Sequence, residues 1–123
     1  MGHILVVDDN LLNVKLLEAR LQIADFEVVT AFSGEEALAK VAQRKPSIIL
    51  LDVMMPGMDG YEVCRRLRAD PATAKLPIAL VTALDKPSDR DTGLAAGAND
   101  FLTKPVEDGM LFTTIHRLLQ KVA

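Results

Sequence analysis

Short runs of apolar residues alternate along this chain with longer stretches whose apolar positions recur every three to four residues. The short runs predict strands and the longer stretches predict helices, because side chains change faces at each residue of a strand and return to one face about every 3.6 residues in a helix. This alternation is typical of βαβ units that wind a parallel sheet. The predicted strands are His3 to Val7, Val28 to Thr30, Ile48 to Leu51, Ile78 to Val81, and Phe101 to Leu102.

Polar residues and glycines mark where the helices begin and end. Asn10 is the predicted N-cap of the first helix, and the spacing of Ser33 and Glu36 predicts a capping box at the start of the second. Gly97 is placed to close the fourth helix in a left-handed conformation. The predicted helices cover about residues 11–24, 33–44, 60–69, 88–96 and 106–122.

The apolar positions of the helices predict which faces are buried. In the first helix, Leu12, Leu16, Leu17 and Leu21 repeat at helical spacing. The fourth helix has few large apolar residues and carries Gly93 in its middle, where Gly costs about 1 kcal/mol relative to Ala. We therefore expect the fourth helix to be the softest element.

Composition narrows the class of protein. With 123 residues, half of them hydrophobic, the chain is expected to fold as one domain over residues 1–123. Its net charge of -3 leaves no basic excess for direct binding of nucleic acid.

The longest wholly apolar strand run, Ile48 to Leu51, is far shorter than the ~20 residues that a membrane span needs. The single cysteine, Cys64, is expected to be a buried, inert thiol. We therefore expect a soluble protein of a reducing compartment, the cytoplasm.

Polar groups suited to phosphate chemistry follow four of the five predicted strands. Asp8 and Asp9 follow the first strand, Asp52 the third, Thr82 the fourth and Lys104 the fifth. Ligands of open α/β sheets bind beyond the carboxyl ends of the strands, so these residues are expected to meet in space. Three converging carboxylates repel one another unless a cation neutralises them, and Mg²⁺ is the natural choice. The alternative is that the two successive acids merely cap the first helix.

The remaining strand-end groups fit transfer of a phosphoryl group to Asp52. Lys104 precedes Pro105, which favours an extended or turn conformation and leaves its ammonium free to pair with a phosphoryl oxygen. Taken alone, Lys104 could equally be a solvated surface charge, and Thr82 could stand at a strand end for propensity reasons. A carboxylate beside a metal and a lysine can attack a phosphoryl group and form an aspartyl phosphate.

Four segments together resemble the receiver domain of two-component response regulators. The resemblance covers essentially the whole chain, and a longer run, Asp52 to Tyr61 followed by Val63 to Arg65, is similar to the receivers that head cyclic-di-GMP-synthesising regulators. The four segments are Ile4–Asn10, Leu50–Gly60, Val81–Ala83 and Phe101–Pro105.

The resemblance implies a fold and a set of roles. The fold is a flavodoxin-like α/β sandwich with strand order 2-1-3-4-5. Asp52 would accept phosphate from a histidine kinase or histidine phosphotransfer protein, and would ligate Mg²⁺ with Asp9 and the backbone carbonyl of Met54, while Asp8 helps through water. Thr82 and Phe101 would form the switch pair. Lys104 would pair with the phosphate and join Pro105 through a cis peptide bond.

Other readings place the chain in different classes. A flavodoxin-type cofactor site needs hydroxyl and backbone donors in the first loop, where this chain has Asp8 and Asp9. Haloacid-dehalogenase-type phosphatases carry a second carboxylate two residues after the nucleophile, where this chain has Met54. We therefore expect a phosphoacceptor that acts on a downstream effector and not a turnover enzyme. The remaining alternative is a phosphorylation-independent pseudo-receiver that only mediates association. For a receiver, signalling is expected to run through the fourth helix, the fifth strand and the fifth helix. Arg90, Asp100 and Arg117 fit part of the charge pattern of receivers that form phosphorylation-dependent homodimers through this face.

Overall fold

The computed structural model describes residues 2–120 and confirms the predicted flavodoxin-like topology. Five parallel strands form one sheet in the order β2-β1-β3-β4-β5, and each strand is followed by a helix. The elements are β1 (Ile4–Val7), α1 (Leu11–Ile23), β2 (Val28–Ala31), α2 (Gly34–Gln43), β3 (Ile48–Leu51), α3 (Gly60–Ala69), β4 (Ile78–Thr82), α4 (Pro87–Ala96), β5 (Asp100–Thr103) and α5 (Asp108–Gln120).

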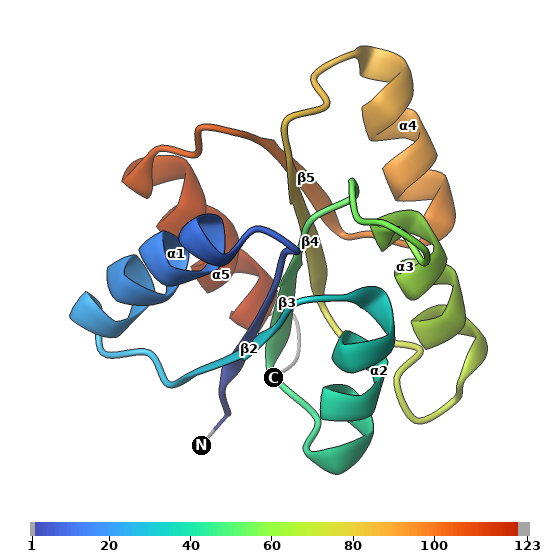
Figure 1. The fold of residues 1–123 in the computed structure, drawn as a ribbon, viewed down its shortest axis with the longest axis horizontal. Helices are drawn as coiled ribbons and strands as arrows, with labels where there is room; N and C mark the ends of the chain where they lie inside the picture. The colour runs from blue at the N-terminus through green and yellow to red at the C-terminus, as the bar shows by residue number, and fades with distance from the viewer. Residues whose placement is uncertain (1, 121–123) are drawn as a thin grey trace.

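Helices cover both faces of the sheet, with α1 and α5 on one side and α2, α3 and α4 on the other (Figure 1). The central strands are therefore buried on both faces and read as continuous apolar runs. Along β1, Leu5 and Val7 face one core cluster while Ile4 and Val6 face the other. Cys64 is fully buried in the first of these clusters, and burial raises its pKa to about 12. The thiol is buried as predicted.

The helix ends follow the sequence signals closely. The Asn10 side chain accepts a hydrogen bond from the Asn13 N–H at 3.0 Å, and Ser33 Oγ accepts one from the Glu36 N–H at 3.0 Å. The carboxylate of Glu36 accepts from the N–H of Phe32, one residue before the N-cap, at 2.8 Å. Gly97 has a φ of +114° and ends α4 in the left-handed conformation, as predicted.

The buried face of α1 agrees with the predicted one at Leu17 and Leu21 and differs from it at Leu12 and Leu16. Val14 and Leu21 are buried and Leu17 is half-buried, whereas Leu12 and Leu16 are 66% and 56% exposed. Residues 14, 17 and 21 lie on one stripe of the helix, and the stripe of residues 12 and 16 is rotated away from the sheet. A leucine-rich helix offers two candidate stripes, and packing against the sheet selects one of them.

Several element boundaries also differ from the predicted ones by one or two residues. Helix α5 begins at Asp108, two residues later than predicted, because the carbonyl of Val106 is bound by the Arg20 guanidinium at 2.7 Å in a loop that precedes the helix. His3 lies just before β1, outside the strand. The predicted end of the last helix at residue 122 lies outside the described residues. Within residues 2–120, no helix combines the length and apolar character needed to cross a membrane.

His3 makes the stability of the fold depend on pH. It is buried, and within the described residues its Nδ1 atom has no hydrogen-bond partner. Burial lowers the pKa of His3, and the nearby Arg44 lowers it further against the opposing effect of Glu27. Below about pH 6.5 the unfolded chain therefore binds a proton that the folded chain resists, so stability falls as pH falls.

We predict that His3→Leu removes this pH dependence. For the wild-type chain, the free energy of unfolding should fall between pH 7 and pH 5.5 by at most about 1.4 kcal/mol per pH unit from this one proton. Urea denaturation at several pH values measures the slope. An equal slope in both proteins over this range would show that His3 is not its source.

Candidate functional site

The parallel register brings the predicted strand-end residues to one edge of the sheet. Asp8 and Asp52 follow β1 and β3, whose last residues Val7 and Leu51 are paired, and Asp52 donates its N–H to the Val7 carbonyl at 2.9 Å. On the other side, the Lys104 N–H donates to the Thr82 carbonyl at 2.8 Å. The carboxyl ends of these strands point to the same edge (Figure 1). Hydrogen bonds that continue the sheet thus fix the backbone at the site.

The start of α3 lies directly against the backbone of Asp52. A Cβ atom at Gly60 would come within 2.3 Å of the Asp52 carbonyl oxygen, so only glycine permits this approach. Gly60 donates its N–H to the Val53 carbonyl at 3.0 Å, and the Asp59 side chain caps the helix by accepting from the Glu62 N–H at 2.9 Å. The loop between Asp52 and α3 is therefore held at both ends.

The Lys104 ammonium lies between two carboxylates. It donates to Asp8 Oδ2 at 2.6 Å and lies 3.4 Å from Asp52 Oδ2. Asp8 also accepts from the Asn10 N–H at 3.0 Å and from the Asn13 side-chain amide at 3.3 Å. Asp52 accepts from the Met54 N–H at 3.3 Å. The Lys104–Pro105 peptide bond is cis.

The two buried carboxylates differ in their electrostatic balance. Burial alone would raise the pKa of Asp8, but its hydrogen bonds from Lys104 and Asn10 lower it below the usual value. Burial raises the pKa of Asp52. Attraction to Lys104 lowers this pKa, but repulsion from Asp8 offsets part of that attraction. Burial opposes the charge on Lys104, yet the two acids raise its pKa. Asp52 is thus the less well neutralised of the pair.

The acidic cluster could hold a metal ion. Asp8, Asp9 and Asp52 each offer a carboxylate oxygen, and these oxygens lie within 4.8 Å of one another. Asp8 and Asp52 are buried, while Asp9 is exposed to solvent. An all-carboxylate set with an open side suits Mg²⁺, which prefers oxygen ligands and keeps several waters. The donor set therefore fits the predicted ion.

The two residues of the predicted switch pair come from neighbouring strands. Thr82 is fully buried, and its hydroxyl accepts a hydrogen bond from the Leu84 N–H at 3.4 Å. Phe101 on β5 is 6% exposed and packs in the core cluster that includes Leu80. His3 and His116 lie outside the carboxylate cluster, as expected from the sequence.

Sequence reasoning missed two residues that support the site. Asn13, on the first turn of α1, binds Asp8 through its side-chain amide. Arg20 on the same helix pairs with Asp108 at 2.7 Å as well as with the Val106 carbonyl, so it holds the loop that follows Lys104. The amide three residues after Asn10 was a visible signal for Asn13, whereas the contact of Arg20 depends on long-range packing.

The carboxyl edge of the sheet thus carries an acidic cluster, a lysine and a buried threonine. This combination of topology and site is typical of phosphoacceptor signalling domains. The chain belongs to the response regulator receiver domain family, whose family model matches residues 4–116. Its role is accordingly that of a phosphoacceptor in two-component signalling.

Particular relatives agree with this assignment. The chain is 57% identical over 117 residues to Response regulator PleD of Caulobacter vibrioides, a match that covers 95% of this chain and 26% of PleD. It is 37% identical to Protein PilH of Pseudomonas aeruginosa, covering 97% of this chain and 98% of PilH. A crystal structure of a putative response regulator from Chloroflexus aurantiacus superposes with a TM-score of 0.92 at 40% identity, covering 97% of this chain and 98% of that one. The chain thus spans about a quarter of PleD and nearly all of PilH.

The incomplete neutralisation of Asp52 predicts that Asp52→Asn stabilises the metal-free fold at pH 7. A carboxyl whose pKa is raised by folding costs stability once pH exceeds its unfolded value, and a neutral amide removes that cost. The urea midpoint in excess chelator should be higher for Asp52→Asn than for wild type. Asp9→Asn is the control, because an exposed substitution usually changes stability by no more than about 0.5 kcal/mol. A lower midpoint for Asp52→Asn would contradict the electrostatic account.

Proposed function

We propose that Asp52 accepts a phosphoryl group from a histidine kinase or a histidine phosphotransfer protein, with Mg²⁺ held by Asp9, Asp52 and the Met54 carbonyl and by Asp8 through water. The observation that carries this proposal is the position of the Lys104 ammonium, 3.4 Å from Asp52 and 2.6 Å from Asp8, beside a carboxylate cluster that fits a divalent ion. Each partner in this arrangement has a use in phosphoryl transfer.

The chemistry requires no general base, because the attacking carboxylate is ionised at neutral pH. An Asp52 oxygen forms the new bond to phosphorus as the bond to the donor histidine nitrogen breaks, and the imidazole leaves as a neutral ring after taking up a proton. Lys104 then pairs with a phosphoryl oxygen as a compact point charge. When bound, Mg²⁺ would neutralise further charge on the transferred oxygens. The Thr82 hydroxyl donates to the same group.

Phosphorylation then changes the surface formed by α4, β5 and α5. Thr82 moves toward the phosphoryl group, and Phe101 swings inward into the space that Thr82 leaves, so that its ring is buried in the phosphorylated state. Asp100 on β5 pairs with both Arg90 on α4 and Arg117 on α5, so the three elements share one charge cluster. A phosphorylation-dependent homodimer would use this surface, on which Met110 is 59% exposed.

The partners are proteins. Leu12 and Leu16 are exposed on α1, and Leu16 lines a cavity of about 350 Å³ together with Asp8 and Lys104. A donor protein that brings its histidine to Asp52 would bury these leucines, which favours association. The output passes to an attached effector domain or a separate effector protein in the bacterial cytoplasm, and the resemblance to receivers of cyclic-di-GMP-synthesising regulators favours a cyclase.

The alternative is a pseudo-receiver that associates with partners without phosphorylation. Two buried carboxylates are costly to keep, even when a cation partly neutralises them. A domain that only associates with partners would gain nothing in return for this cost. The retained set of Asp8, Asp9, Asp52 and Lys104 therefore favours the phosphoacceptor.

We predict that phosphorylation requires both Asp52 and Mg²⁺. Radiolabelled acetyl phosphate should label the wild-type chain in the presence of Mg²⁺, and excess chelator should abolish the label because the acidic cluster then repels the donor. Asp52→Asn should reduce labelling to background, while Asp25→Asn, a substitution in the exposed turn after α1, serves as the control. Undiminished labelling of Asp52→Asn would refute the assignment of the acceptor.

The phosphorylated state should be long-lived, because the side chains two residues after Asp52 and Thr82 offer no acceptor for an attacking water. These are Met54, which is 57% exposed, and the half-buried Leu84. Replacing both, as Met54→Asn with Leu84→Glu, should speed loss of phosphate about tenfold by orienting that water. Decay of the label after removal of the donor gives the rate. Ile23→Glu, an acid introduced at an exposed position of α1, controls for added charge, and equal rates in all three proteins would count against the idea.

A further inference from the structure

Helix α4 contains a glycine at a point where the helix lies directly against the sheet. Gly93 is buried in the middle of α4, although glycine is among the poorest helix formers. A Cβ atom at this position would lie 2.7 Å from Leu80 Cδ1 and 3.0 Å from Phe101 Cδ2. The missing side chain therefore leaves the space into which the Phe101 ring and Leu80 pack.

Neither neighbour has free room to withdraw within this packing. Leu80 is fully buried and Phe101 is 6% exposed, and both belong to the core cluster on the α2, α3 and α4 side of the sheet. The Arg90 guanidinium of α4 also donates to the Phe101 carbonyl at 3.1 Å, so helix and strand are joined through the backbone of the same residue. The position of α4 and the burial of the Phe101 ring thus depend on each other.

The two ends of α4 are held differently. At its C-terminal end, Arg68 donates to the Gly97 carbonyl at 2.8 Å and to Asn99 Oδ1 at 2.9 Å, and the same Asn99 oxygen accepts from the Ile78 N–H at 2.8 Å. This network ties the end of α4 to α3 and to the start of β4.

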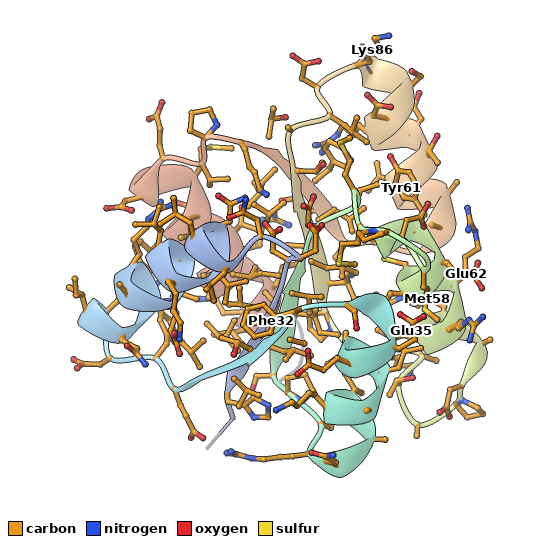
Figure 2. All side chains as sticks on the ribbon, in the orientation of Figure 1. Phe32, Glu35, Met58, Tyr61, Glu62 and Lys86 are labelled. Atoms are coloured by element: carbon orange, nitrogen blue, oxygen red, sulfur yellow. The ribbon has the colours of Figure 1, made fainter. Side chains whose placement is uncertain are left out.

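Toward its N-terminal end, the hydroxyl of Tyr61 donates to the Asp89 carbonyl at 3.1 Å. Figure 2 shows Tyr61 beside α4, with Lys86 at the N-terminal end of the helix. The other contacts of this half come from Arg90, whose side chain is 52% exposed and reaches the Phe101 carbonyl and Asp100 of β5. The N-terminal half of α4 is thus held to β5 through Phe101 and its neighbour, whereas the C-terminal end is held by the Arg68 network.

We propose that Gly93 is the positioning residue of the switch: it lets α4 lie on the buried Phe101 ring, so that α4 tilts about its Arg68-held end when the ring leaves. This inference rests on the proposed phosphoacceptor function and adds to it the residue that transmits the position of the ring to the helix. Any side chain at residue 93 would disfavour the buried ring and, with it, the phosphorylated state.

The first test compares Gly93→Ala with Gly109→Ala. Alanine should stabilise a helix in either place on propensity alone, and Gly109 in α5 has open space around its Cβ position. We expect Gly93→Ala to lower the urea midpoint and to weaken the binding of beryllofluoride, a phosphoryl mimic, about tenfold in the presence of Mg²⁺. Gly109→Ala should bind it as wild type does. The ¹⁹F NMR signal of the bound mimic reports its affinity directly.

A second test removes the ring that alanine would displace. In a Phe101→Leu background, adding Gly93→Ala should change the affinity for beryllofluoride less than twofold, because the ring is absent and the smaller side chain leaves Leu80 room to shift. An equal loss of affinity in both backgrounds, or wild-type affinity in Gly93→Ala, would overturn the proposal. If Gly93→Ala alone does not fold, folding of the double variant supports the proposal and unfolding of both contradicts it. Failure of the proposed function itself is distinct, since wild type would then bind no beryllofluoride at all.

Discussion

The contact of one ammonium with two carboxylates is the interaction on which the chemistry of this structure depends. Lys104 can lie between Asp8 and Asp52 only because β1, β3, β4 and β5 are parallel and end at the same edge of the sheet. Buried acids at this separation would otherwise repel each other strongly, since the surrounding protein screens charge poorly. The apolar strands behind them therefore stabilise the fold and also position the charges. The site exists because the sheet brings together groups that would not approach one another alone.

The same sheet connects that edge to α4. Thr82 ends β4 beside the carboxylates, and Phe101 lies on β5, the next strand, with α4 packed over its ring. Leu80, two residues before Thr82 on the same strand, is paired with Phe101 and also lies against Gly93 of α4. Closely packed interiors favour discrete alternative arrangements over gradual deformation. The geometry gives our proposal its two-state element: the ring beneath Gly93, and the helix that rests on it.

Much of the fold and of the candidate site could be predicted from the sequence. The physical reasons for these successes also explain which predictions were wrong. Strand-end polar residues such as Asp52 were informative because parallel topology dictates where strand ends meet. The caps at Asn10 and Ser33 were predictable because they involve neighbours in the chain. The buried face of α1 was not, because its leucines form two stripes and only tertiary packing chooses between them. Gly93 was correctly identified as unusual, but its close approach to Leu80 and Phe101 is a long-range contact that no local pattern reveals.

The central claim is that Asp52 is the group that receives the phosphoryl group, and chemical mapping of the wild-type chain tests it most directly. Phosphorylate the protein with acetyl phosphate and Mg²⁺, reduce the acyl phosphate with borohydride, and locate the modified residue by peptide mass spectrometry. The account predicts that the reduced side chain is at Asp52 and that Asp8 and Asp9 are unmodified. Reduction at another carboxylate, or at none after confirmed exposure to donor and Mg²⁺, would contradict it.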